Sequence, residues 1–189
     1  VLAKEMGSLD VISSGRLLLG IGAGYLHQEF SALGVDFSSR GTKTDESIEI
    51  IRTLWNEANP EYQGQFIQFK NIQAQPRPIQ AGGPPIIIGG TRQAALRRTV
   101  THGKGWYGFA LDVKTTNSVL ENLEIAKSRY ERDQNLGPLS ISITPPSRPS
   151  KTMMEDYAAI GVERYIPILA SSGEPTSLTY LDKLNSELF

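Results

Sequence analysis

Hydrophobic residues along this chain follow two kinds of pattern, short continuous runs and stretches with helical spacing. Five apolar runs predict buried strands, and they lie at residues 16–22, 85–90, 105–110, 139–144 and 163–169. Apolar residues three or four positions apart predict helices, and they lie at residues 26–33, 48–55, 95–100, 119–130, 154–158 and 178–188. Strands that alternate with helices indicate βα units, an α/β fold and a mostly parallel sheet.

The first residues already have the pattern of a helix interior. Leu2, Met6, Leu9 and Ser13 fall at i, i+4, i+7 and i+11, which is the spacing of one face of a helix. No capping residue precedes them, and the chain opens at Val1 without a methionine. We therefore interpret the sequence as a piece of a longer protein.

Local signals predict several element boundaries. Thr42 and Asp45 have the spacing of a capping box at the start of a helix, and Thr91 has the side chain of an N-cap. Residues 61–72 alternate around a glycine and predict a small hairpin. Pro167 cannot donate a hydrogen bond to a neighbouring strand, so it weakens the last predicted strand.

Composition excludes several functional classes. The 189 residues are enough for one domain with a sizeable core. A net charge of −1 without a basic block suggests neither nucleic acid nor an anionic membrane as a partner. The absence of cysteine excludes disulfides, thiolate metal sites and a cysteine nucleophile, and no metal-ligand cluster stands out. The absence of cysteine says little about the compartment, and a cytoplasmic protein is the default expectation. No apolar run approaches the roughly 20 residues of a membrane span.

Three glycines two positions apart, Gly20, Gly22 and Gly24, follow the first strand in the segment RLLLGIGAG. A dinucleotide-binding fingerprint needs another glycine where Tyr25 stands, and an acidic residue after a second strand about 20 positions on. No such strand is predicted there, which also argues against a methyltransferase turn. The spacing leaves open a tight strand-to-helix corner in which side chains do not fit.

A second glycine pair, Gly89 and Gly90, lies between a buried strand and a helix. Backbone N–H groups at a helix N-terminus, the hydroxyl of Thr91 and the positive end of the helix dipole together favour an anion. Two glycines would let a phosphate approach the backbone closely. A plain strand-to-helix corner capped by Thr91 is an equal alternative on these residues alone.

Much of the chain lies in two segments, LDVISSGRLLLGIGAGYLHQEFSALGVDFSSRGTKTDESIEIIRTLW (9–55) and PRPIQAGGPPIIIGGTRQAALRRTVTHGKGW (76–106). Their order and spacing resemble the luciferase-like monooxygenase superfamily, in particular its coenzyme F420-dependent oxidoreductases. The resemblance implies a (βα)8 TIM barrel, present here as about five parallel strands that alternate with helices. Active sites in this architecture lie at the C-terminal ends of the strands.

The resemblance also implies two cofactor contacts. One turn would pass close to the ring system of a flavin or deazaflavin, and it comprises Gly22, Ala23, Gly24 and Tyr25. The other would hold the cofactor phosphate, and it comprises Gly89, Gly90 and Thr91.

Family members begin about a third of a barrel earlier, with three more strands. Residues 1–189 are therefore expected to form a single luciferase-like domain that lacks the N-terminal third of the barrel. Five strands cannot close an eight-stranded barrel, and exposed edges invite association, so a homo-oligomer is expected. The residues that act on the substrate are not assigned, and the resemblance implies that they precede Val1.

The resemblance implies an F420-dependent oxidoreductase that carries out hydride transfer or monooxygenation on a small organic substrate. Two alternatives stay open. One is an FMN-dependent luciferase-like monooxygenase, and the other is a non-catalytic flavin-binding or purely structural βα protein. The activity of this piece by itself is also open.

Five further residues have candidate roles. His27 follows the first glycine turn and is either a general acid or base or a surface histidine. His102 is expected at a helix C-terminus, where a cation complements the dipole. Glu29 and Arg40 match family positions and are expected to form an ion pair that braces residues 34–41. Trp106 lies at a strand and either lines the pocket or belongs to the core.

Overall fold

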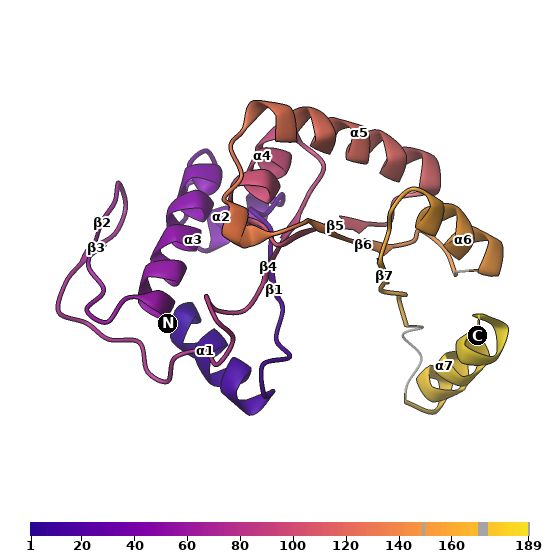
Figure 1. Ribbon diagram of the computed structural model, residues 1–189, viewed down its shortest axis with the longest axis horizontal. Coiled ribbons are helices and arrows are strands. Elements are labelled where there is room, and N and C mark those ends of the chain that lie inside the picture. The colour runs from indigo at the N-terminus through magenta and orange to yellow at the C-terminus, as the bar shows by residue number, and fades with distance from the viewer. Residues whose placement is uncertain (149, 170–173, 189) are drawn as a thin grey trace. The chain divides into compact units, whose positions relative to one another are not determined.

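The computed structural model contains two compact units, residues 1–88 and residues 89–189, and it describes residues 1–148, 150–169 and 174–188. Helices and parallel strands alternate along the chain, as the apolar pattern predicted (Figure 1). The five predicted strands are present, which confirms the α/β class. The single domain over residues 1–189 stays a prediction.

In the first unit, two strands pair in parallel and share a core with two helices. Its elements are α1 (Leu2–Ile12), β1 (Leu19–Ile21), α2 (His27–Ala32), α3 (Arg40–Asn56), β2 (Tyr62–Gln63), β3 (Gln68–Phe69) and β4 (Ile86–Gly89), whose last residue opens the second unit. Leu19 lies opposite Ile86, and Ile21 lies opposite Ile88. The core of this unit comprises Ala3, Leu19, Ile48, Ile51, Trp55, Ile86 and Ile88.

Helix α1 is present as predicted, and the face that it buries is not the one with the apolar spacing. Its buried residues are Ala3, Gly7 and Asp10. Leu2 and Leu9, two of the residues with that spacing, are 48% and 45% exposed. The helix backbone comes very close to a neighbouring segment, since a Cβ on Gly7 would lie 2.6 Å from the carbonyl oxygen of Pro76. Only the face with the smallest side chains permits this approach.

Both predicted helix caps are wrong by a few residues. Helix α3 begins at Arg40 with Ser39 as its N-cap, so Thr42 lies inside the helix and caps nothing. The helix that follows β4 is α4 (Gln93–His102), whose N-cap is Arg92 rather than Thr91. The left-handed Gly90, with φ of +114°, turns the chain before Thr91, which leaves Thr91 outside the helix.

The predicted hairpin at residues 61–72 is confirmed, and a buried carboxylate holds its turn. Strands β2 and β3 pair antiparallel, with Tyr62 opposite Phe69. The carboxylate of Glu46, on α3, accepts hydrogen bonds from the backbone N–H groups of residues 65, 66 and 67 at 2.7–3.1 Å. Glu46 is only 7% exposed, so the hairpin turn supplies the partners that a buried charge requires.

Strands and helices also alternate in the second unit. Its elements after α4 are β5 (Gly105–Phe109), α5 (Val113–Arg129), the 3-10 turn η1 (Gln134–Leu136), β6 (Ser140–Thr144), α6 (Lys151–Ala159), β7 (Arg164–Tyr165) and α7 (Glu174–Leu188). β6 pairs in parallel with both β5 and β7. Ile141 and Ile143 pack with apolar residues of α4, α5 and α6 in one core. β7 ends two residues before Pro167, in line with the predicted weakening of this strand.

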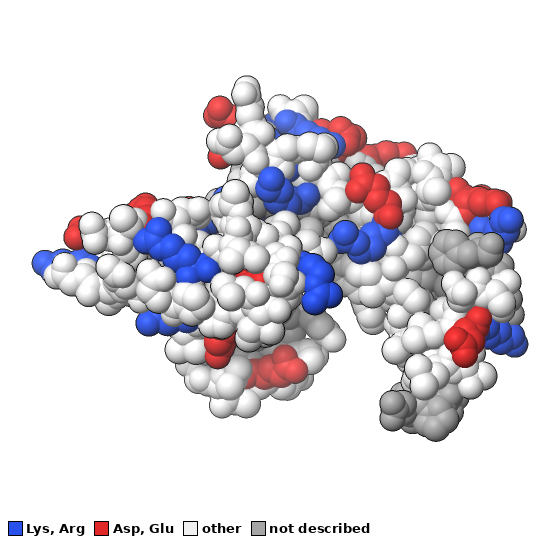
Figure 2. Space-filling model, turned by 60° about the horizontal axis from the view of Figure 1, so that its bottom comes forward, with Lys and Arg blue, Asp and Glu red and all other residues white. Residues whose placement is uncertain are grey.

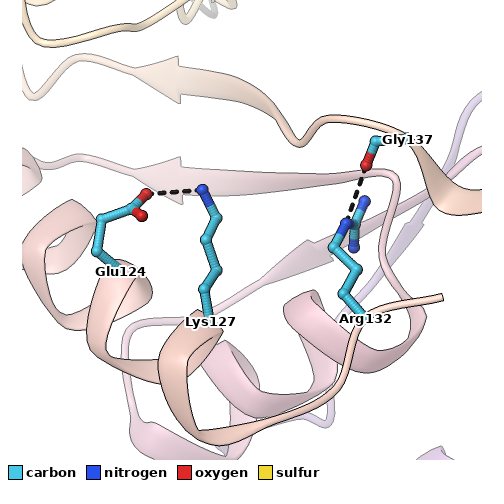
Figure 3. Close-up of polar contacts among 4 residues, drawn as sticks. All are labelled: Glu124, Lys127, Arg132 and Gly137. Carbon is cyan, nitrogen blue, oxygen red and sulfur yellow. Dashed lines mark hydrogen bonds and ion pairs between the residues drawn. The ribbon is translucent and has the colours of Figure 1, made fainter. Parts of the chain in front are cut away.

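Arg132 closes the C-terminal end of α4. Its guanidinium donates to the carbonyl oxygens of Val100 and Gly103 at 2.9 and 2.8 Å, and to that of Gly137 at 2.9 Å (Figure 3). Helix C-termini leave carbonyl groups without intrahelical partners, and a guanidinium satisfies several of them at once. This single side chain therefore ties α4 to the segment that leads into β6.

The surface carries mixed charge. Lysine and arginine side chains alternate with aspartate and glutamate over the face that Figure 2 shows, with broad uncharged areas between them. No helix among the described residues is long and apolar enough to cross a membrane.

Candidate functional site

The first glycine turn follows β1 and is open to solvent. Gly22 and Gly24 are exposed, Ala23 is half-buried, and Tyr25 is 83% exposed. A Cβ on Gly22 would meet no heavy atom within 4 Å, so the space beside this residue is empty. Gly24 has φ of +79°, and a Cβ there would lie 2.7 Å from the ring of Phe30. Gly24 therefore serves the turn itself, whereas Gly22 leaves room for a ligand.

A groove of about 420 Å³ borders this turn. Gly20, Gly22 and Ala23 form one wall, and α3 supplies Arg40 and Thr44. The remaining lining is mainly apolar, with Leu2, Leu19, Ile21, Phe30, Val35, Ile48 and Ile51. A concave, largely apolar surface with a few polar groups is typical of small-molecule sites. The structure brings Gly22 and Ala23 to this groove, and Tyr25 is not part of its lining.

The predicted ion pair between Glu29 and Arg40 is wrong. Within the described part of the chain, these two side chains form no ion pair within 4.0 Å. Arg40 instead lies over the ring of Phe37, with its guanidinium carbon 3.7 Å from the ring centre, and donates to the Phe37 carbonyl oxygen at 2.8 Å. The rings of Phe30 and His27 also contact Phe37, each at 5.2 Å between ring centres. Aromatic and cation–π packing, rather than a charge pair, braces residues 34–41.

Asp36 organises the start of α3. Its carboxylate accepts hydrogen bonds from the backbone N–H groups of Ser38 and Ser39, both at 3.0 Å, and from the Ser38 hydroxyl at 2.6 Å. The Ser38 side chain is the largest of several hydrogen-bond contributions that lower the pKa of Asp36 from 3.8 to about 2. Hydrogen bonds to the charged form favour that form.

We expect the contribution of Asp36 to stability to depend on pH. Because its pKa is lower in the folded state, the contribution is present above pH 3.8 and is lost as the pH falls through about 2. The difference in unfolding free energy between the wild type and Asp36→Asn should be largest near pH 5 and shrink by pH 2.5. Urea unfolding at both pH values measures it, and a difference that does not change with pH would contradict the assignment.

The second glycine turn lies between β4 and α4. Gly89 is half-buried at the end of the strand, and Gly90 and Thr91 are exposed. A Cβ on Gly90 would lie 3.0 Å from the Cβ of Ala95, in the first turn of α4. Helix α4 begins at Gln93, and the N–H groups of Ala95 and Leu96 donate to the carbonyl oxygen of Arg92. The N–H groups of the two residues before them, Gln93 and Ala94, have no partner within the helix.

Trp106 supports this turn from the core. Its indole is completely buried and donates through Nε1 to the carbonyl oxygen of Gly90 at 2.8 Å. Of the two roles left open by the sequence, the core role is the one observed. The same side chain also fixes the turn, because the hydrogen bond points one peptide group of Gly90 away from solvent.

The tyrosines with shifted pKa values in the second unit have structural roles. Burial is the main cause that raises the pKa of Tyr157 and of Tyr165, so both stay protonated. Tyr157 donates to the carbonyl oxygen of Leu111, and Tyr165 donates to that of Met153. Both hydroxyls are therefore donors to backbone carbonyl groups within this unit.

Two buried carboxylates, those of Glu46 and Asp10, were not predicted from the sequence. Each lies on a helix and accepts backbone hydrogen bonds from a segment that is distant in the sequence. A charged residue in a helix is usually solvated, and neither position has a local signal of burial. His102, as predicted, is the last residue of α4.

A family model described as luciferase-like monooxygenase matches residues 1–178. The chain belongs to the luciferase-like monooxygenase family. An uncharacterized family relative from Mycobacterium tuberculosis is 36% identical over 106 residues, which are 56% of this chain and 36% of the relative. An FMNH2-dependent dimethylsulfone monooxygenase from Pseudomonas fluorescens is 31% identical over 108 residues, which are 56% of this chain and 29% of that enzyme. The matches thus span about a third of the length of these luciferase-like relatives.

Among solved structures, an F420-dependent secondary alcohol dehydrogenase has a similar fold. It covers 100% of this luciferase-like chain with a TM-score of 0.77 and 12% identity, and the match spans 74% of that enzyme. This likeness shows the fold alone. Flavin- and F420-dependent oxidoreductases are therefore both among the proteins to which this chain is similar.

Proposed function

We propose that this chain is the cofactor-binding part of a flavin- or deazaflavin-dependent oxidoreductase, with coenzyme F420 as the cofactor. The phosphate would bind at Gly89, Gly90 and Thr91. The turn that comprises Gly22, Ala23, Gly24 and Tyr25 would lie next to the ring system. The substrate would be a small organic molecule, which undergoes hydride transfer or monooxygenation.

The exposed glycine turn directly before α4 is the observation that carries the proposal. Gly90 and Thr91 are both exposed, and the left-handed backbone of Gly90 turns the chain just before the first residues of the helix. An anion there would meet backbone N–H groups, the hydroxyl of Thr91 and the positive end of the helix dipole. The indole of Trp106 donates to the carbonyl oxygen of Gly90 and would keep this arrangement in place before a ligand arrives.

The cofactor would supply the redox chemistry, and the protein would supply binding and orientation. The residues of this chain contribute in two ways. The turn at Gly90 would anchor the phosphate, and the empty space beside Gly22 would admit a flat ring close to the backbone. The groove residues Phe30 and Val35 would shield such a ring from water.

An FMN-dependent monooxygenase is the second candidate. The observation that favours it is the similarity to the FMNH2-dependent enzyme from Pseudomonas fluorescens. Titration of the chain with F420 and with FMN separates the two candidates, since the correct cofactor should bind more tightly. Failure to bind either one would support a non-catalytic role and would overturn the proposal for this chain.

Replacement of Gly90 by alanine is expected to weaken the binding of both cofactors at least about tenfold. A Cβ at this positive φ would shift the turn and misplace at least one of its N–H donors. A hydrogen bond to a charged group contributes roughly 1.5–3 kcal/mol, and a factor of ten in affinity corresponds to about 1.4 kcal/mol. Fluorescence titration measures the dissociation constants. Gly161→Ala is the matched control, because Gly161 also has a positive φ, +92°, and open space around it. Equal affinities for the wild type and Gly90→Ala would reject the phosphate site.

A further inference from the structure

A second, smaller groove lies in the unit that contains the proposed phosphate turn. Its volume is about 190 Å³, and it begins at Thr91 and runs between α4 and the C-terminal part of α5. Its polar lining comprises Thr91, Gln93, Asn122, Arg129 and Tyr130, and its apolar lining comprises Leu96, Ile125 and Ala126. Pockets that enclose a whole small molecule usually exceed roughly 300 Å³, so this groove has room for one part of a ligand.

Arg129 is the cation of this groove, and no residue that the structure describes pairs with it. The guanidinium forms no hydrogen bond, ion pair or ring contact with any residue that the structure describes, and the side chain is exposed. Lys127, two positions earlier on the same helix, differs in this respect. Its ammonium lies 2.6 Å from the carboxylate of Glu124 (Figure 3). The lysine is neutralised by its neighbour, whereas the arginine leaves a positive charge available at the groove.

The other polar groups of the lining suit the same kind of ligand. The amide of Gln93 and the hydroxyl of Tyr130 both offer donors, and a guanidinium binds a carboxylate through two parallel hydrogen bonds. The side chains of Leu96 and Ile125 provide an apolar surface for a short carbon chain. A carboxylate on a short aliphatic arm therefore matches the charge and the size of the groove.

We propose that this groove binds a carboxylate that the cofactor carries beyond its phosphate, with Arg129 as the charge partner. The inference rests on the proposed phosphate site, because Thr91 belongs both to that turn and to the groove. FMN ends at its phosphate, whereas the deazaflavin F420 continues through its phosphate into a carboxylate-bearing tail. Arg129 is thus a specificity-determining residue that favours F420 over FMN.

The test compares two charge-removing variants on one helix. Arg129→Gln should weaken F420 binding about threefold to tenfold, as expected for one exposed charged contact, and leave FMN binding unchanged. Lys127→Gln, the matched control, should change neither affinity. The effect of Arg129→Gln should also diminish in 1 M salt, where the screening length is about 3 Å. Fluorescence titration of the 189-residue chain gives all of these values, and circular dichroism checks the fold.

Each outcome separates this inference from the proposed function. If Gly90→Ala weakens both cofactors but Arg129→Gln leaves F420 binding unchanged, the phosphate site stands and the groove assignment is wrong. Arg129 would then only complement the dipole at the C-terminus of α5. Equal weakening by Arg129→Gln and Lys127→Gln would indicate non-specific attraction and would also overturn the groove. If Gly90→Ala changes neither affinity, the phosphate site itself fails.

Discussion

Replacement of Gly83 by alanine is expected to lower the free energy of unfolding by about 2–5 kcal/mol. Gly83 has φ of +87°, and a Cβ there would lie 2.1 Å from Cε3 of Trp55. The left-handed backbone costs an alanine roughly 1–2 kcal/mol, and overpacking adds typically 1–3 kcal/mol. Trp55 has little freedom to move, because it is 4% exposed and its indole Nε1 donates to the carbonyl oxygen of Ala3 at 2.9 Å.

Gly82 offers a matched control one position earlier. It has a similar φ of +79°, but a Cβ there would meet nothing within 4 Å. Gly82→Ala should therefore lower the free energy of unfolding only by the cost of the left-handed backbone, roughly 1–2 kcal/mol. Urea unfolding of the two variants measures the difference, which reports the contact with Trp55. Equal decreases in the free energy of unfolding for Gly82→Ala and Gly83→Ala would show that Trp55 moves aside without an energetic cost.

Replacement of Asp10 by alanine is expected to destabilise the first unit by about 3 kcal/mol or more. The Asp10 side chain is fully buried and accepts hydrogen bonds from the backbone N–H groups of Ile79 and Gln80, at 2.9 and 3.0 Å. It also accepts one from the Gln80 amide at 2.6 Å. Each buried donor left without a partner costs roughly 1–3 kcal/mol. Asp10→Ala leaves up to three such donors without a partner.

Glu5, an exposed acidic residue on the same helix, provides the comparison for Asp10. Glu5→Ala should change the unfolding free energy by less than about 0.5 kcal/mol, as is usual for surface positions. Hydrogen exchange adds a local readout, because the amides of Ile79 and Gln80 should lose protection in Asp10→Ala. Unchanged protection at these two amides would show that Asp10 does not hold this segment.

The order and type of the elements could be predicted from the sequence because they depend on neighbouring residues. The three consecutive isoleucines at 86–88 form β4, and the apolar spacing of α5 buries Val119, Leu123 and Ala126 as expected. Pro167 follows a strand of only two residues. In each case the deciding feature is the spacing of apolar residues or the absence of a backbone N–H donor. Both features can be recognised from a short stretch of sequence.

The candidate site was predictable only in part. The glycines marked two turns, and the structure places Gly22 and Gly90 in exposed turns that follow β1 and β4. Arg129 was not predictable as a groove residue, because its proximity to Thr91 depends on how α4 and α5 pack. The pairing of Glu29 with Arg40 failed for the same reason, since the position of Phe37 decides where the guanidinium lies.

The sequence by itself therefore determined the α/β class, the alternation of strands and helices, and the glycine turns. Tertiary structure alone decided which face of α1 is buried and which polar side chains are internal. Asp10 shows the physical reason, because its partners lie 69 and 70 positions further along the chain. A helix with two partly apolar faces buries the one that its neighbour can approach, and at Gly7 the carbonyl oxygen of Pro76 leaves room only for a hydrogen atom.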